Sequence, residues 1–266
     1  MPTRVIERMA VECDGDGEAV LMIHGLGGTS NVWTPVLAAL TRHMVVRPDL
    51  PGSGRSHRVE GTLSIARFVE AMQRVCAGLR LDRVHVAAHS LGTIVALHLA
   101  VTAPRLVRSL ALFGPLASPP DAARPGIRAR AAKARGEGEA GMQAIADQLL
   151  QTAVSPETRA RRPMALTAVR ELLMRQCPDG YARTCEALAD AQPAEVSGIA
   201  CPTLLVTGDE DAVAPPQAVR QLGARISGAR VEVLARCGHW TPIEKPAECE
   251  DLLKRFYAQR MERSHP

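Results

Sequence analysis

The stretch Val84-His-Val-Ala-Ala-His-Ser-Leu-Gly92 changes character at its serine. Before it, Val84 to Ala88 form a short apolar run that predicts a buried strand. After it, residues 93–100 are apolar on more than one face, which is typical of a buried helix. A strand, a sharp turn at Ser90 and a buried helix are together the layout of a nucleophile elbow.

Small residues flank Ser90 where an elbow needs them. The sharp turn brings the positions two before and two after the serine close together, so large side chains would clash there. Ala88 and Gly92 meet this need, although Ala88 replaces the first glycine of the usual Gly-x-Ser-x-Gly pattern. Because a serine between small residues is also common as an ordinary helix N-cap, the assignment depends on the rest of the chain.

Composition narrows the function classes. No apolar run approaches the roughly eighteen residues that cross a membrane, and residues 1–10 lack the apolar core of a secretion signal, so we expect a cytoplasmic protein. The seven cysteines are scattered without a Cys-x-x-Cys pair, which favours reduced thiols over a zinc site. A net charge of +4 and 3% aromatic residues give no indication of a nucleic-acid or membrane partner. We therefore expect no metal site and no nucleic-acid or membrane partner; no oligomeric state is indicated.

Predicted strands and helices alternate over the first part of the chain. Short strands are expected within residues 3–13, and the remaining predictions are strands at 20–23, 44–47, 84–88 and 109–113 and helices at 31–40, 64–79 and 93–100. Such alternation implies parallel pairing through right-handed crossovers. The sequence therefore predicts an α/β fold with a mostly parallel central sheet flanked by helices.

The alternation stops after the sixth predicted strand. Residues 115–198 contain no convincing strand, and their arginine-rich helical stretches are predicted at 122–135, 142–152, 157–176 and 180–189. Strands resume at 203–206 and 231–234, with a helix from Pro216 and a final helix over 244–258. We therefore expect a helical cap, 115–198, inserted into a core made of 1–114 and 199–266.

Two later strands end in residues that could serve an elbow serine. Gly208-Asp-Glu-Asp211 follows the strand at 203–206, and Cys237-Gly-His239 follows the strand at 231–234. The order Ser90, Asp211, His239 is that of a nucleophile, an orienting acid and a general base in α/β-hydrolases. His239 would take the proton of Ser90 and return it to the leaving group.

Asp209 competes with Asp211 for the orienting role, because the two lie two positions apart. Asp209 directly follows the strand, where its carboxylate is expected to accept backbone N–H bonds within the turn. Asp211 lies further along the loop and can reach toward His239. We therefore predict Asp211 as the orienting acid.

An oxyanion hole requires two backbone N–H groups. One is predicted at Leu91, and the other at Leu26, whose flanking glycines permit a close backbone approach. The same loop, Gly25-Leu-Gly-Gly-Thr-Ser30, also imitates a dinucleotide-binding fingerprint. That alternative lacks the third glycine, because Ser30 takes its place, and it leaves Asp211 and His239 unexplained.

Over essentially its whole length the sequence resembles the α/β-hydrolase superfamily. The resemblance rests on His24-Gly-Leu-Gly27, Asp49-Leu-Pro-Gly-Ser-Gly-Arg-Ser56, Ala88-His-Ser-Leu-Gly92, Gly208-Asp-Glu-Asp211 and Gly238-His239. Within the superfamily, Gly180–Asp190 and Asp211–Pro216 are similar to segments of 3-oxoadipate enol-lactonases. The oxyanion loop, the loop after the next strand and Trp240 depart from those enzymes, so the reaction class carries over better than the substrate.

This resemblance implies hydrolysis of a small carboxylic ester or lactone through an acyl-enzyme on Ser90, with no cofactor and with the small-molecule substrate as the only expected partner. It also admits C–C bond hydrolases, perhydrolases and triad-bearing small-molecule receptors, which remain alternatives. The cap would form the roof of the substrate pocket. The candidate lining residues are Trp33, Leu116, Met142, Leu149, Leu172, Met174, Tyr181 and Trp240.

Overall fold

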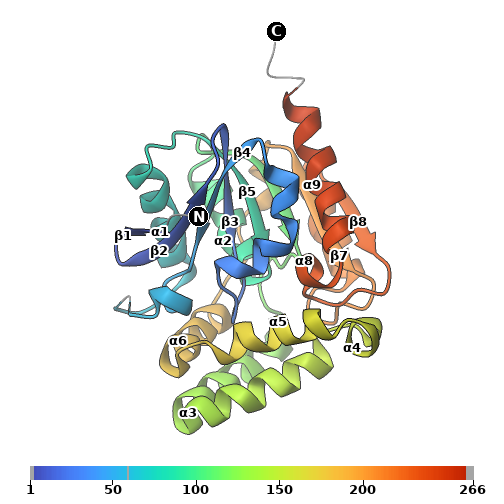
Figure 1. The fold of residues 1–266 in the computed structure, drawn as a ribbon. Coiled ribbons are helices and arrows are strands. Elements are labelled where there is room, and N and C mark those ends of the chain that lie inside the picture. The colour runs from blue at the N-terminus through green and yellow to red at the C-terminus, as the bar shows by residue number, and fades with distance from the viewer. Residues whose placement is uncertain (1–2, 59, 262–266) are drawn as a thin grey trace.

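A computed structural model describes residues 3–58 and 60–261, and its centre is one eight-stranded sheet (Figure 1). The strands are β1 (Thr3–Ile6), β2 (Met9–Asp14), β3 (Glu18–Ile23), β4 (His43–Pro48), β5 (Val84–His89), β6 (Val107–Phe113), β7 (Thr203–Gly208) and β8 (Arg230–Leu234). Their order is β1-β2-β4-β3-β5-β6-β7-β8. The pairs β1/β2 and β2/β4 are antiparallel and all the others are parallel, which confirms the predicted sheet.

Strand β5 lies at the middle of the sheet, between β3 and β6. All six of its residues are buried, because both faces of a parallel sheet are covered by helices. This burial explains why the strand is mostly apolar, with His85 and His89 as its two polar residues. The chain leaves β5 directly into the helix α2 (Leu91–Thr102), so Ser90 stands at the carboxyl end of the sheet.

Helices cover the sheet on both sides (Figure 1). They are α1 (Ile65–Gly78), α2, α7 (Pro216–Ala224), α8 (Thr241–Glu244) and α9 (Pro246–Met261), with 3₁₀ segments η1 (Ser30–Leu40) and η2 (Gly54–Ser56). The element α1 packs on α2, and η1 packs on α8 and α9. No helix in the described part of the chain is long and apolar enough to cross a membrane.

Three helix predictions differ in detail from the structure. Residues 30–40 form a 3₁₀ segment, and Pro35 within it has no backbone N–H to donate. The predicted helix at 157–176 is two helices, because Arg162 precedes Pro163 and residues before proline avoid helical geometry. The last predicted helix is likewise divided into α8 and α9, just before Pro246.

Residues between β6 and β7 form a helical layer at one end of the sheet (Figure 1). We call residues 115–198 the helical insertion. It contains η3 (Asp121–Ala123), α3 (Arg124–Thr152), α4 (Pro156–Arg161), α5 (Pro163–Met174), α6 (Pro178–Ala189) and η4 (Val196–Gly198). The long helix α3 packs on α5 and α6, and Gly138, with φ of 60°, interrupts it between the two stretches predicted as separate helices.

Candidate active site

Ser90 occupies a strained backbone position between β5 and α2. Its φ is 52° and its ψ is −121°, a conformation that side chains with a Cβ rarely adopt. A Cβ on Gly92 would lie 2.5 Å from the carbonyl oxygen of Ile23, so this turn requires glycine there. Ala88 is fully buried, and its methyl group is accommodated where the usual pattern has glycine. The turn therefore has the geometry expected of an elbow.

His239 bridges Ser90 and Asp211. Its Nε2 lies 2.8 Å from Ser90 Oγ, and its Nδ1 lies 2.8 Å from Asp211 Oδ2. The three residues follow β5, β7 and β8, and all three are buried. Burial raises the pKa of Asp211, but His239 and the backbone N–H groups it accepts outweigh burial and hold that pKa below its usual value. A carboxylate beside Nδ1 favours the tautomer that leaves Nε2 free to accept the serine proton.

The two aspartates of this loop have different hydrogen bonds. Asp211 Oδ1 accepts the N–H groups of Val213 and Ala214, each at 2.8 Å, while its other oxygen faces His239. Asp209 Oδ1 accepts the N–H of Cys237 at 3.1 Å and so joins its loop to the one that carries His239. The backbone bonds within the turn, which we expected at Asp209, are therefore made by Asp211.

The predicted oxyanion residues lie on either side of Ser90. Leu91 is the first residue of α2, where a backbone N–H has no acceptor within its own helix. Leu26 lines the same cavity as Ser90. Gly25 makes the approach possible, because a Cβ on it would lie 2.7 Å from Ser90 Cβ.

The histidine before this loop holds the loop in place. His24 is fully buried, its Nδ1 lies 2.8 Å from Gly25 O, and its Nε2 accepts the N–H of Leu50 at 2.9 Å. Burial lowers its pKa, so the neutral ring donates at Nδ1 and accepts at Nε2. Its role in this geometry is to support the loop.

A cavity of about 520 Å³ lies between the carboxyl end of the sheet and the helical insertion, and Ser90 and His239 contribute to its wall. Of the predicted lining residues, Leu116, Leu149, Tyr181 and Trp240 line it. Lining residues that we did not predict include Pro119, Pro120, Ala123, Ile127, Arg130, Lys133, Gln148, Thr152, Leu188 and Val213.

The other predicted lining residues lie elsewhere. Trp33 is fully buried within η1 and packs edge-on against Phe113, with ring centroids 5.7 Å apart. Met142 and Leu172 are buried in the apolar core, and Met174 is partly buried against it. Hydrophobicity marked these residues, but it does not distinguish a core position from a cavity wall.

The cavity wall is mostly apolar and contains two cationic side chains. Arg130 and Lys133 lie one turn apart on α3, and no Asp or Glu is among the described residues that line the cavity. Lys133 forms an ion pair with Glu137, whereas no ion pair of Arg130 is found within residues 3–58 and 60–261. In the sequence, the only indication of these two cations in the cavity is the arginine-rich composition of residues 122–135. The same composition is equally typical of a solvated helix face.

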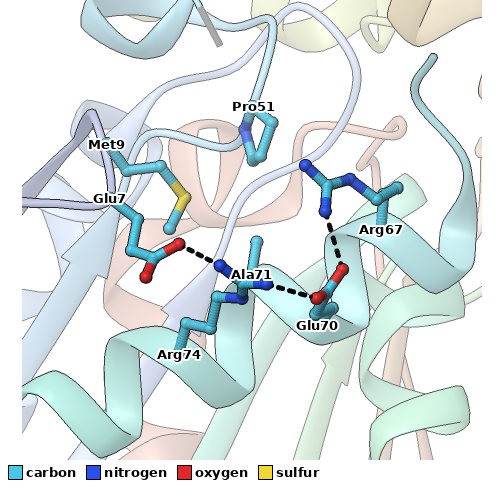
Figure 2. Close-up of a pocket in the computed structure, with 7 residues that line it drawn as sticks. All are labelled: Glu7, Met9, Pro51, Arg67, Glu70, Ala71 and Arg74. Carbon is cyan, nitrogen blue, oxygen red and sulfur yellow. Dashed lines mark hydrogen bonds and ion pairs between the residues drawn. The ribbon is translucent and has the colours of Figure 1, made fainter. Parts of the chain in front are cut away.

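A smaller hollow of about 30 Å³ lies between the β1–β2 turn and α1. Figure 2 shows Arg74 between Glu7 and Glu70, with Arg67 also paired to Glu70. The hollow is too small for a substrate. The Arg74–Glu7 ion pair connects the first hairpin to α1, and the other two pairs lie within α1. No cluster of three or more His, Cys, Asp or Glu in the described residues could hold a metal ion.

Comparisons with known proteins agree with this architecture. Residues 18–246 match the family described as "alpha/beta hydrolase fold". A 2-hydroxymuconate semialdehyde hydrolase of Pseudomonas putida is 30% identical over 92% of this chain and 89% of its own length. The solved enol-lactonase from Burkholderia xenovorans LB400 is 26% identical, with a TM-score of 0.88 over 97% of this chain and 100% of that one. A thermophilic esterase from Thermogutta terrifontis has a TM-score of 0.91 at 23% identity, over 97% and 99% of the two chains.

Proposed function

Since the chain belongs to the alpha/beta hydrolase fold family, we propose that it is a serine hydrolase that cleaves a small carboxylic ester or lactone. The observation that carries this proposal is the continuous contact Ser90 Oγ, His239 Nε2, His239 Nδ1 and Asp211 Oδ2, with 2.8 Å at each hydrogen bond. Ser90 and His239 also line a mostly apolar cavity whose size suits a small substrate.

In the first half of the proposed reaction, Ser90 Oγ attacks the ester carbonyl and its proton passes to His239 Nε2. The backbone N–H groups of Leu26 and Leu91 stabilise the oxyanion that forms. Collapse of this intermediate breaks the bond to the leaving oxygen, which takes the proton from His239. The acyl group then remains on Ser90, and Asp211 stabilises the imidazolium while it exists.

In the second half, water attacks the acyl-enzyme and gives its proton to the neutral His239. The intermediate collapses to the free acid, and Ser90 recovers its proton from the imidazolium. A lactone follows the same steps, except that the leaving oxygen stays attached to the acid as a hydroxyl group.

In the proposed enzyme, the helical insertion forms the roof of the cavity and sets its shape. The reaction needs no metal or cofactor, and we propose a cytoplasmic location for it.

Cleavage of a C–C bond next to a ketone is the second candidate, and the 30% identity to a semialdehyde hydrolase favours it specifically. A perhydrolase and a small-molecule receptor built on the same three residues are the remaining alternatives. Each predicts a different outcome in one assay.

A substrate screen separates these candidates. The purified protein is incubated with p-nitrophenyl esters of graded acyl length, with several lactones and with a vinylogous 1,5-diketone, and with the esters again in the presence of peroxide. Release of nitrophenol or opening of a lactone ring supports the proposal. Turnover confined to the diketone would establish the C–C alternative, peroxide-dependent turnover the perhydrolase, and saturable binding without any turnover the receptor.

A further inference from the structure

Glu244, at the end of α8, is a fully buried carboxylate that the proposed reaction does not use. Its Oε2 accepts the N–H of Ser155 at 2.9 Å and that of Gly238 at 3.1 Å. Its Oε1 accepts the N–H of Trp240 at 3.1 Å. One carboxylate therefore holds the residues on both sides of His239.

The backbone of His239 itself is fixed from two further directions. Its N–H donates to the carbonyl oxygen of Ala153 at 2.9 Å, and its carbonyl oxygen lies 2.9 Å from Nε2 of His89. Burial lowers the pKa of His89 to about 3, so its neutral ring donates this bond from Nε2. Three consecutive residues, 238–240, thus have hydrogen-bonded backbone groups.

Two of these partners belong to the helical insertion. Ala153 and Ser155 lie between α3 and α4, directly beside the cavity wall. Ser155 also caps α4, because its Oγ accepts the N–H of Thr158 at 3.2 Å. The segment 153–155 therefore connects the helical insertion to residues 235–240, which we call the His239 loop. Glu244 accepts hydrogen bonds from both of these segments.

We propose that Glu244 is a positioning residue that fixes the His239 loop against Ser90 and couples it to residues 153–155 of the helical insertion. This inference rests on the proposed function, because it assumes that His239 works on Ser90. In this arrangement the strength of the Glu244 bonds affects the rate of proton transfer more than it affects substrate binding.

A carboxylate is required at this position because three N–H donors converge on it. Both oxygens of a carboxylate accept hydrogen bonds, whereas a glutamine amide offers one acceptor oxygen and one NH₂ group. In either orientation of the amide, its NH₂ would face at least one of the N–H groups of Ser155, Gly238 and Trp240. Glu244→Gln therefore replaces an attraction by a repulsion next to His239 with almost no change in volume.

The test compares Glu244→Gln with Glu157→Gln and Glu244→Asp. Glu157 forms ion pairs with Arg236 of the same loop and with Lys245, the residue after Glu244, each at 3.0 Å. Among the described residues it forms no hydrogen bond or ion pair with Ser90, Asp211 or His239, so it is the matched control. For an ester found in the screen, Glu244→Gln should lower kcat roughly tenfold to a hundredfold and leave KM nearly unchanged, since small displacements of reacting groups cost that much.

The control should keep the kcat of the unmodified protein, and Glu244→Asp, which retains two acceptor oxygens, should recover part of the lost rate. A folded Glu244→Gln protein with normal kcat would overturn the inference, as would a change confined to KM. Ser90→Ala, measured in parallel, tests the proposed function separately. If Ser90→Ala kept its rate of hydrolysis, the proposed function would fail; if it lost hydrolysis, the result for Glu244→Gln would bear on the positioning role alone.

Amide hydrogen exchange of the unmodified protein keeps the inference testable if Glu244→Gln does not fold. The amides of Ser155, Gly238 and Trp240 share one acceptor group, so they should be protected and should exchange at a common rate. Exchange of Gly238 and Trp240 at the rate of a free loop, while Ser155 stays protected, would contradict the coupling.

Discussion

At the scale of single residues, the loop after β7 shows how one carboxylate serves two purposes. Asp211 uses Oδ1 to accept two backbone N–H groups of its own turn and Oδ2 to contact His239. The turn therefore holds the side chain in the orientation that His239 requires. Asp209 has no such contact, and its bond to Cys237 connects two loops.

These contacts predict different effects for two matched substitutions. Asp211→Asn should lower kcat by about 10⁴-fold, because an amide opposite Nδ1 favours the wrong histidine tautomer. Asp209→Asn should retain nearly full activity and lose about 1 kcal/mol of unfolding free energy through its weakened bond to Cys237. Steady-state kinetics and urea denaturation of both variants measure the two effects. Inactive Asp209→Asn beside active Asp211→Asn would reverse the assignment.

At the scale of elements, buried strands were predictable and the cavity wall was not. Strands such as β5 and β7 are buried on both faces, so their sequences are mostly apolar. The ends of β5, β7 and β8 also placed Ser90, Asp211 and His239 at one edge of the sheet. The cavity, by contrast, depends on which face of α3 turns inward, and the sequence of α3 has weak apolar periodicity that leaves this open.

Interruptions within elements also escaped prediction where two signals competed. Residues 157–176 have helical composition throughout, but the geometry that Pro163 imposes on Arg162 divides them. Glu244 escaped for a different reason. A glutamate at the start of the predicted helix 244–258 reads as an exposed residue, and only the fold brings three N–H groups around it.

Arg130 lies on the face of α3 that lines the cavity, so a substitution there tests whether the protein prefers a charged substrate. A cavity with two cations and no lining carboxylate in the described residues should favour a substrate with an acidic group. Arg130→Gln should therefore lower kcat/KM for an ester with a terminal carboxylate about tenfold or more, in line with the value of a charged hydrogen bond. It should leave the uncharged ester of equal length nearly unaffected.

Arg128 supplies the control for this comparison, since it lies on the same helix but pairs with Asp190 at 2.6 Å and does not line the cavity. Arg128→Gln should leave both esters nearly unaffected. Equal losses for both esters in Arg130→Gln would show that Arg130 contributes packing and not charge selection.

At the scale of the whole molecule, four buried histidines make stability depend on pH. Burial lowers the pKa values of His24, His43, His85 and His89, to about 4 for His85 and about 3 for His89. In the unfolded chain a histidine has a pKa near 6.5, so between these values the unfolded state binds more protons than the folded state. The stability they contribute is present above about pH 6.5 and is lost as pH falls toward the folded values.

We therefore expect the free energy of unfolding to decrease as pH falls from 7 to 4. Removing one of these groups with His89→Gln should reduce the slope by up to about 1.4 kcal/mol per pH unit in that range. Urea denaturation at several pH values measures both slopes. A stability that rises on acidification, or an unchanged slope in His89→Gln, would contradict this reading.

The whole molecule is arranged around Ser90, which we propose as its nucleophile. The most direct test of this proposal is covalent labelling with a fluorophosphonate, followed by peptide mass spectrometry and by rate measurements on Ser90→Ala. We expect one label per chain on Ser90, no label on Ser90→Ala, and a loss of hydrolysis of about 10⁶-fold in that variant. Labelling of a different serine with Ser90 left unmodified, or hydrolysis by Ser90→Ala at the rate of the unmodified protein, would contradict it.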